Sequence, residues 1–312
     1  MVEWYVWAGF LAFVAFVLSL DLGVFHRRAH RVPYSEALIW TGVWVALAIG
    51  FAGMVWAWRG GHTAGEFIAG YLIEWSLSLD NVFVWILIFT HLSVPSRYQH
   101  RVLFWGVVGA VILRLGFILG GTALLHRFHW VTYVFGALLL FTAIRFLRER
   151  DRQASIEESA MLRLVRRMVP VTERYQGQRL LIHSHGRLLA TPLLAVLIMV
   201  EVTDVVFAVD SIPAIFAVTQ DAFVVFASNA LAILGLRSLY FVLAGSLGRF
   251  RYLKPALAAL LAFVAVKMLI SSWIEIPIPL SLAAIAAILG VGALASWLRP
   301  DQSRREHVGP SG

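Results

Sequence analysis

The chain has no cysteine among its 312 residues, and charged residues are scarce in it. Without cysteine it cannot form disulfides, thiolate metal sites or a cysteine nucleophile. The HExxH motif of zinc proteases and the GxxxxGK[ST] loop of nucleotide-driven pumps are missing as well. Asp, Glu, Lys and Arg make up 14% of the residues, whereas about 25% is usual in soluble domains. These absences argue against a soluble enzyme, a disulfide scaffold and an ATP-driven pump.

Apolar residues take the place of the missing charge. They make up 60% of the chain, the mean hydropathy is +0.79, and apolar runs of 18 or more residues recur. A run of this length is enough to cross a bilayer as a helix. A soluble fold of this size could not enclose so much apolar surface. The sequence therefore predicts a polytopic membrane protein of the all-α class, surrounded by the lipid bilayer.

The apolar runs predict a bundle of about nine transmembrane helices. The first run is not expected to be a signal peptide, because Glu3 precedes it and its apolar stretch is too long. The predicted spans cover residues 4–25, 37–58, 67–90, 102–124, 130–147, 189–219, 222–246, 256–274 and 278–298.

The distribution of Lys and Arg predicts the orientation of these helices. If the N-terminus is outside, 21 of the 26 basic residues lie on the cytoplasmic side, three lie within spans, and only Arg59 and Arg127 lie outside. Loops rich in Lys and Arg stay on the cytoplasmic side. We therefore expect an outside N-terminus and a cytoplasmic C-terminus in a bacterial inner membrane. Because topology explains the net charge of +8, no nucleic-acid partner is expected.

Residues 148–188 form the one long hydrophilic stretch. The segment MLRLVRRMVPV within it predicts a short basic amphipathic helix. We interpret the stretch as a solvated cytoplasmic connector near anionic headgroups. A regulatory or partner-binding element is the alternative.

Six of the 18 acidic residues fall inside predicted spans. An ionised residue at mid-bilayer costs about 2.5–3.5 kcal/mol unless it pairs, is neutralised or lines water. The bases at similar depth are Arg114, Arg237 and Lys267, and we expect each of them to pair with a carboxylate. A surplus of carboxylates remains, which indicates a functional site. The six acids are Asp21, Glu74, Asp80, Glu201, Asp204 and Asp210.

Two short segments carry five of these acids and are similar to each other. They read EWSLSLDNVFV at 74–84 and EVTDVVFAVDSIP at 201–213. Placing Asp80 on Asp210 also places Glu74 on Asp204, and an arginine follows in the next span of both units. Because each unit contains three spans, the second would be inverted relative to the first, as in many transporters.

The domain organisation follows from this repeat. We expect two N-terminal transmembrane helices in 1–66, the first repeat in 67–147, the basic loop in 148–188, the second repeat in 189–274, and a last helix with a tail in 275–312.

Helix geometry and one proline refine the expected site. Glu201 and Asp204 are three residues apart, so they share a helix face. Pro213 removes one backbone amide, so we expect the helix to kink or unwind at Asp210 and Ser211.

The side chains of both segments offer oxygen donors only. Besides the carboxylates, Asn81 brings an amide oxygen and Ser211 a hydroxyl. Oxygen ligands suit hard cations such as Mn²⁺, Mg²⁺ or Ca²⁺, whereas all ten histidines fall in loops, at span ends or in the tail. We therefore predict a transported divalent cation and no resident cofactor. We expect the repeats to bring its ligands together at mid-membrane: Glu74, Asp80, Asn81, Glu201, Asp204, Asp210 and Ser211.

At these residues the chain resembles the TerC family of integral membrane proteins, associated with tellurite resistance and manganese export. The matching stretches are SLDNVFVW at 78–85, EVTDVVFAVDSIPAIFAVT at 201–219 and SNALAILGLRSLYF at 228–241, with weaker support from DLGVFHR at 21–27 and RVLFWG at 101–106. The family is grouped with LysE-type exporters, which contain three-span repeats. The resemblance implies efflux of a metal cation, above all manganese, through the five carboxylates. Tellurite is an anion, which such an interior would repel.

These observations favour a secondary transporter that exports a divalent cation in exchange for protons, and no enzyme activity is expected. One alternative is a membrane scaffold that docks partner proteins of a tellurite or metal stress complex through the basic loop. Another is an exporter of a small organic cation or amino acid. An intramembrane aspartyl protease is disfavoured, because its Gly-x-Gly-Asp context is missing. The sequence makes no prediction of the oligomeric state.

Overall fold

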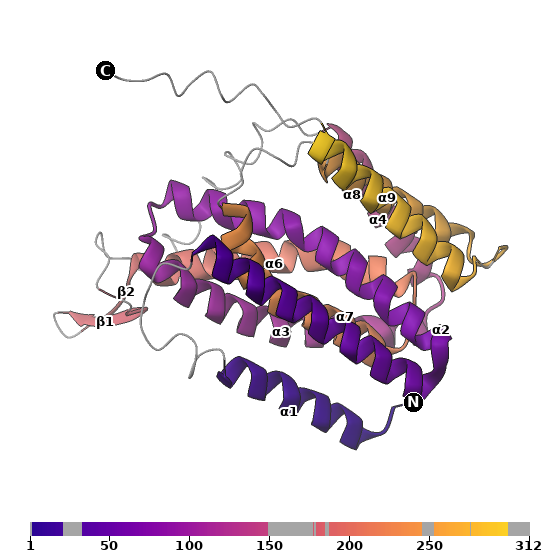
Figure 1. Ribbon diagram of the computed structural model, residues 1–312, viewed down its shortest axis with the longest axis horizontal. Coiled ribbons are helices and arrows are strands. Elements are labelled where there is room, and N and C mark those ends of the chain that lie inside the picture. Colours follow the sequence, from indigo (N-terminus) through magenta and orange to yellow (C-terminus); the bar gives the residue numbers. More distant parts are fainter. Residues whose placement is uncertain are drawn as a thin grey trace.

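The apolar runs of the sequence fold into helices in the computed structural model of the chain (Figure 1). The structure describes residues 2–20, 33–148, 177, 179–184, 187–244, 253–274 and 276–298. The helices are α1 (Trp4–Leu20), α2 (Tyr34–His91), α3 (Ser96–Arg127), α4 (Val131–Arg148), α6 (Pro192–Phe216), α7 (Ala222–Ala244), α8 (Leu253–Ile270) and α9 (Ile278–Leu298), and the strands are β1 (Leu181–Ser184) and β2 (Arg187–Ala190). By length and hydropathy, six of the described helices could each cross a membrane, namely α2, α3, α4, α6, α7 and α9.

Helix α2 has 58 residues and consists of two arms that meet at Gly60. Gly60 has φ 86° and ψ 172°, a backbone conformation that in practice only glycine adopts. The two arms form a V whose apex lies at the same end of the bundle as the N-terminus (Figure 1). The break falls between the predicted spans 37–58 and 67–90, so one residue makes the turn for which the sequence predicts a longer connection.

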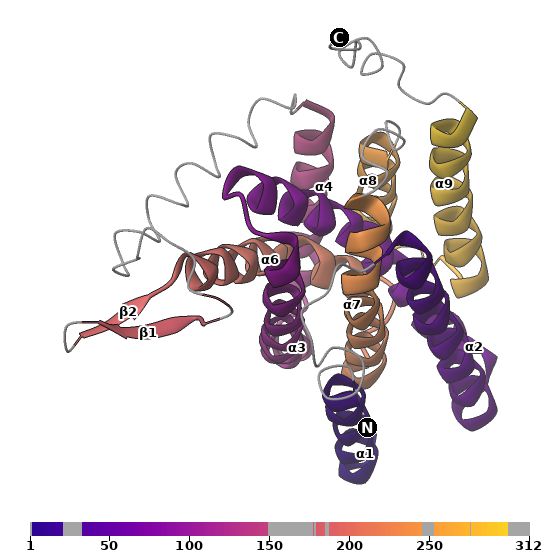
Figure 2. The same ribbon diagram turned by 60° about the vertical axis from the view of Figure 1, so that its left-hand side comes forward.

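Three helix pairs build the bundle, and each joins a helix from the first half of the chain to one from the second. The most extensive contact is between α2 and α7, followed by α4 with α8 and α3 with α6. Helix α7 lies at the centre of the bundle, and most of its residues are buried (Figure 2). In each pair a glycine faces a side chain of the partner helix, which brings the two backbones close: Gly70 on α2, Gly136 on α4 and Gly106 on α3.

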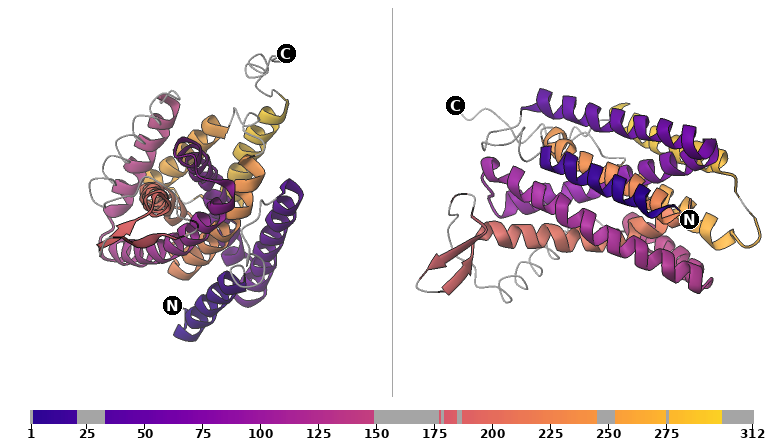
Figure 3. Two further views of the ribbon diagram at one scale, coloured as in Figure 1. Left: turned by 90° about the vertical axis from the view of Figure 1, so that its left-hand side faces the viewer. Right: turned by 90° about the horizontal axis from the view of Figure 1, so that it is seen from below.

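A short antiparallel hairpin of β1 and β2 precedes α6 and projects from the end of the bundle opposite the N-terminus (Figure 3). Leu181 pairs with Ala190 and Ser184 with Arg187. The hydroxyl of Thr191 closes the base by donating to the carbonyl oxygen of Arg179 (2.7 Å). The all-α prediction misses this hairpin, because four-residue strands are too short to show a clear alternation of polar and apolar residues.

Helix α6 corrects one expectation from the sequence. It runs without interruption through Asp210 and Ser211 to Phe216, so the predicted unwinding at these residues is wrong. The reason is the position of Pro213, which lies in the last turn, where the loss of one amide disturbs few helical hydrogen bonds. The helix also starts later than the predicted span 189–219, because β2 takes up residues 187–190.

Several predicted features lie outside the described residues. They are Asp21, the basic helix expected at 161–171 and the tail after residue 298. The count of nine transmembrane helices and the inverted relation of the repeats stay predictions.

Candidate functional site

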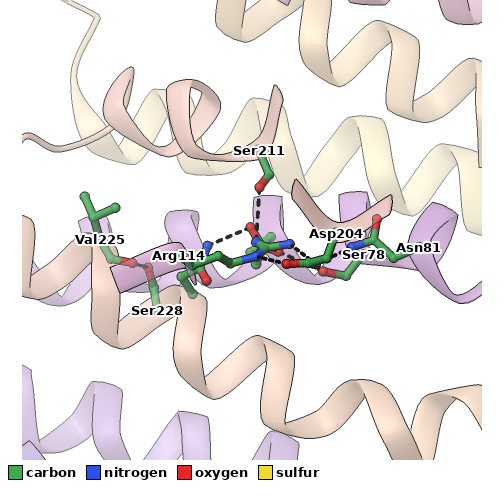
Figure 4. A network of polar contacts seen from close by, with 9 residues as sticks. Ser78, Asn81, Arg114, Asp204, Ser211, Val225 and Ser228 are labelled. Carbon is green, nitrogen blue, oxygen red and sulfur yellow. Dashed lines mark hydrogen bonds and ion pairs between the residues drawn. The ribbon is translucent and has the colours of Figure 1, made fainter. Parts of the chain in front are cut away.

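A buried arginine, Arg114 of α3, joins acidic residues from two other helices (Figure 4). Its Nε and Nη2 donate to the two carboxylate oxygens of Asp204 on α6, at 3.2 and 2.9 Å. Its Nη1 donates to Glu74 on α2 and, at 3.1 Å, to the hydroxyl of Ser211 on α6. All three charged side chains are at most 2% exposed. The prediction that Arg114 pairs with acids is confirmed, and it pairs with two of them at once.

Neutral donors also hydrogen-bond to these two carboxylates. On α2, Ser78 donates to Oε1 of Glu74 at 2.8 Å, while Asn229 of α7 donates to Oε2 at 3.0 Å. The amide of Asn81 donates to Oδ1 of Asp204 at 3.3 Å. Buried charges are stable only when they are paired and hydrogen-bonded. Four helices therefore hold the two acids in fixed positions.

A small cavity lies beside this network and has room for about one water molecule or ion. At its edge, Asp210 is fixed by Thr142 of α4, whose hydroxyl donates to Oδ1 at 2.8 Å. The side-chain oxygen of Asn81 is buried and has no hydrogen-bond partner within the described part of the chain. An unsatisfied buried acceptor costs about 1–3 kcal/mol, which a bound cation or water would recover. The cavity is lined by Glu74, Leu77, Asn81, Arg114, Phe146, Phe207, Asp210 and Ser211.

The network lies near the middle of its helices. Asp204 is equally far from both ends of α6. Glu74 and Arg114 are each at least 13 residues, or about 20 Å, from the ends of α3 and of the second arm of α2. Since the hydrocarbon core of a bilayer is about 30 Å thick, we expect these charges at the depth where isolated charges cost most.

The five predicted carboxylates are not gathered into one metal site. Glu74, Asp204 and Asp210 meet at or beside the cavity, but Asp80 and Glu201 do not line it. Across the residues that the structure describes, no three His, Asp or Glu side chains are placed so that they could hold a metal ion. The expected meeting of Asp80 and Asp210 with the other acids is therefore not seen. The physical reason is helix geometry: Glu74 and Asp80 lie six residues apart on α2, about 240° around its axis, so they do not share a face.

Glu201 lies one helical turn from Asp204 and packs against the backbone of α3 at Gly109. A β-carbon at position 109 would overlap the Glu201 carboxylate. Oε2 of Glu201 is buried and has no hydrogen-bond partner in the described ranges. Glu201 and Asp204 thus share a face of α6 that is directed toward α3, as predicted. Only Asp204 reaches Arg114.

The other two buried bases lie elsewhere. Arg237 of α7 lines a second small cavity together with Trp44 and Phe104, so the predicted equivalence with Arg114 does not extend to its surroundings. Lys267 of α8 donates to the hydroxyl of Ser281 on α9 at 2.9 Å. Among the described residues it makes no direct ion pair, but the carboxylate of Glu66 on α2 lies near enough to interact with it electrostatically.

The sequence matches known membrane proteins over most of its length. The model of the family described as "Integral membrane protein TerC family" matches residues 59–304. The chain belongs to the TerC family. The resemblance in the acidic segments is thereby confirmed, and the protein is an integral membrane protein.

Curated relatives cover nearly the whole TerC-family chain. An uncharacterized membrane protein of Myxococcus xanthus is 51% identical over 294 residues, which are 94% of this chain and 92% of that protein. A protein of Escherichia coli (strain K12) named "Putative membrane-bound redox modulator Alx" is 44% identical over 293 residues, 91% of each chain. An uncharacterized membrane protein of Rickettsia felis is 36% identical over 293 residues. No solved structure matches this chain.

Sequence analysis missed three residues of the network, namely Ser78, Thr142 and Asn229. Ser78 lies four residues after Glu74, and this spacing could have identified it as a neighbour on the same helix face. Asn229 lies in the stretch SNALAILGLRSLYF, which carries part of the family resemblance. Thr142 gives no such signal, because its partner is 68 residues away in the sequence.

Proposed function

We propose that this TerC-family protein is a secondary transporter that exports a divalent cation, with manganese as the preferred substrate. One observation carries the proposal: two carboxylates and one guanidinium line a cavity in the middle of the helices, and a third carboxylate lies beside it. Glu74, Asp204 and Asp210 bring three negative charges. Arg114 and, near Asp210, Arg145 supply two positive charges, so the surroundings of the cavity stay negative. This negative charge attracts a cation and repels an anion such as tellurite.

The atoms around the cavity support a hard cation. Carboxylate oxygens of Glu74 and Asp210, the unpartnered oxygen of Asn81 and the hydroxyl of Ser211 are all oxygen donors. Mn²⁺, Mg²⁺ and Ca²⁺ prefer such donors. No histidine is among the residues that line the cavity, which disfavours zinc and nickel. Manganese is preferred within the hard cations because of the family resemblance.

The pairing of the helices supports two inverted repeats. In this scheme the second arm of α2, α3 and α4 correspond to α6, α7 and α8. Exchanging the two units converts the α2–α7 contact into the α3–α6 contact and leaves α4–α8 unchanged, and these are the three most extensive contacts. Counting the two arms of α2 separately then gives nine membrane-crossing helices. A transporter of this type binds its substrate between the repeats and opens alternately to either side.

Protons are the proposed counter-ions. When the cation leaves, the remaining negative charge in a low dielectric favours proton uptake, so metal binding and protonation oppose each other. The proposed orientation puts the hairpin end in the cytoplasm of a bacterial inner membrane, because segments rich in Arg stay on the cytoplasmic side. The turn between α6 and α7 then lies outside.

Three alternative functions are thiol redox chemistry, export of an organic cation and a non-transporting scaffold. Thiol redox chemistry cannot be carried by this chain, which has no cysteine. An organic cation needs more space than a cavity for one water or ion offers. A scaffold would tolerate the loss of one charge at Asp210, which provides the test.

The test is Mn²⁺ flux into proteoliposomes that contain the purified protein, recorded together with internal pH. We expect wild-type protein to move Mn²⁺ against a proton flux in the opposite direction. Asp210→Asn keeps the acceptor for Thr142 and removes one charge, so the protein should fold while flux falls to the level of empty liposomes. Glu3→Gln, at an exposed carboxylate near the N-terminus, is the matched control. Wild-type flux in the Asp210→Asn protein would rule out the cavity as the transport site.

A further inference from the structure

Arg114 is at once the residue that braces the candidate site and a cation that occupies it. Its guanidinium contacts both carboxylate oxygens of Asp204, one oxygen of Glu74 and the hydroxyl of Ser211. The contact of Arg114 with Asp204 is a bidentate ion pair, which is the strongest contact that arginine forms with a carboxylate. A guanidinium does not lose its proton in a protein, so only another cation can take its place between these acids.

While Arg114 is bound to the acids, too few oxygen ligands are left for a divalent cation. A hard divalent cation needs about six oxygen ligands or more, some of them waters. Every oxygen of Glu74 and Asp204 already accepts at least one hydrogen bond, and the Ser211 hydroxyl accepts one from Arg114. Of the polar side chains that line the cavity, Asp210 and the Asn81 oxygen remain without a contact to Arg114. Two such groups are too few to strip the water from a divalent cation.

We propose that Arg114 is a tethered counter-cation: it binds Glu74 and Asp204 while the substrate is absent, and the divalent cation must displace it to be transported. This inference rests on the proposed function and assigns a role to Arg114, which is not one of the proposed ligands of the cation. When Arg114 moves aside, Glu74, Asp204 and Ser211 become ligands beside Asp210 and Asn81, and they form an oxygen site with a sufficient number of donors.

The displacement also gives the site a way to empty. A cation held by three carboxylates in a low dielectric would bind too tightly to leave. When the guanidinium returns, it replaces part of the positive charge of the departing cation. Release of the cation therefore does not leave all three acids unpaired. Arg114 therefore lowers the affinity for the cation while it makes turnover possible.

The test measures Mn²⁺ binding to the purified protein in lipid nanodiscs by electron paramagnetic resonance, which detects free Mn²⁺. Arg114→Lys keeps the buried positive charge but cannot contact both oxygens of Asp204 at once. Because the charge is kept, a simple repulsion of Mn²⁺ by the base predicts unchanged affinity. Displacement predicts that the Lys variant binds Mn²⁺ more tightly, by about tenfold for the loss of one charge-assisted hydrogen bond. We expect the same variant to export Mn²⁺ more slowly.

Three further variants complete the test. Arg59→Lys, in the ion pair with Asp221 that joins α2 to the start of α7, is the matched control and should leave Mn²⁺ affinity unchanged. If Arg114→Lys folds poorly, Glu74→Gln is compared with the double variant Glu74→Gln/Arg114→Met, which removes one charge of each sign. The double variant should bind Mn²⁺ more tightly than Glu74→Gln alone.

The outcomes separate this inference from the proposed function. Equal or weaker Mn²⁺ binding by the Arg114 variants, with clear binding by wild type, overturns the counter-cation role and leaves the transport proposal standing. No Mn²⁺ binding by wild type or by any variant overturns both. Tighter binding by Arg114→Lys, with Arg59→Lys unchanged, supports displacement.

Discussion

The buried acids of this TerC-family protein differ in what holds them in place. Glu74 and Asp204 are braced by Arg114, so they are part of the scaffold as well as candidate ligands. Asp210 accepts a hydrogen bond from the neutral hydroxyl of Thr142 and keeps its charge directed at the cavity. Glu201 packs against a helix backbone. Residues of one chemical type therefore have different roles, and the contacts of each decide which role it has.

The Glu201 contact gives a prediction at the residue scale. Gly109→Ala would place a methyl group where the Glu201 carboxylate lies, so we expect a loss of about 1–3 kcal/mol in the free energy of unfolding. Gly116→Ala on the same helix meets open space and is the matched control, which should be neutral or stabilising. Thermal unfolding of the detergent-purified proteins, followed by tryptophan fluorescence, measures the difference.

A second variant checks the cause. In a Glu201→Ala background the clash is gone, so the added Gly109→Ala should cost little. If Gly109→Ala is as stable as Gly116→Ala in the wild-type background, the packing of Glu201 on α3 is wrong.

At the scale of elements, the arms of α2 have separate tasks. The second arm carries Glu74 and Asn81 to the cavity. The first arm ends at Arg59, which pairs with Asp221 at the start of α7 (2.6 Å). Asp221 also caps α7 by accepting the amide of Phe223 at 2.9 Å. The turn in α2 thus ties both arms to the central helix.

Gly60 makes this turn possible, and its substitution is the prediction at the element scale. Alanine is strained at φ 86° and ψ 172°, so Gly60→Ala should lower the free energy of unfolding by about 1–3 kcal/mol, although no atom blocks its β-carbon. Gly53→Ala lies within the first arm, also in open space, and should be neutral or stabilising. Unfolding in a titration with SDS measures both. Equal midpoints for the two variants would show that the turn does not need a glycine.

At the scale of the whole molecule, the two ends of the bundle should face different compartments. The arginine asymmetry predicts that residue 160 is cytoplasmic and that the turn between α3 and α4 is external. The chain has no cysteine, so single substitutions can be labelled without background. A membrane-impermeant maleimide should label His129→Cys in intact cells and Ala160→Cys only after the cells are opened. The reverse pattern would mean that the protein is inserted the other way round.

The sequence by itself determined the class and the family of this protein. Scarce charge, long apolar runs and two acidic segments were enough to predict a helical membrane protein of the TerC family with buried carboxylates and a buried base. These features are local in the chain, because hydropathy, helix length and short motifs each depend on a few neighbouring residues. The prediction that Arg114 pairs with an acid also succeeded, since a charge at mid-bilayer needs a partner whatever the fold.

Tertiary structure alone decided which partners meet. The sequence placed five carboxylates together, whereas the folded chain joins Glu74 and Asp204 through Arg114, directs Asp210 to the cavity and leaves Asp80 outside its lining. It also kept α6 helical past Asp210 and brought Thr142 to this acid from a distant helix. These outcomes depend on how helices are rotated and packed against one another. Repeat symmetry in a sequence fixes the order of the side chains but not the angle at which each helix presents them.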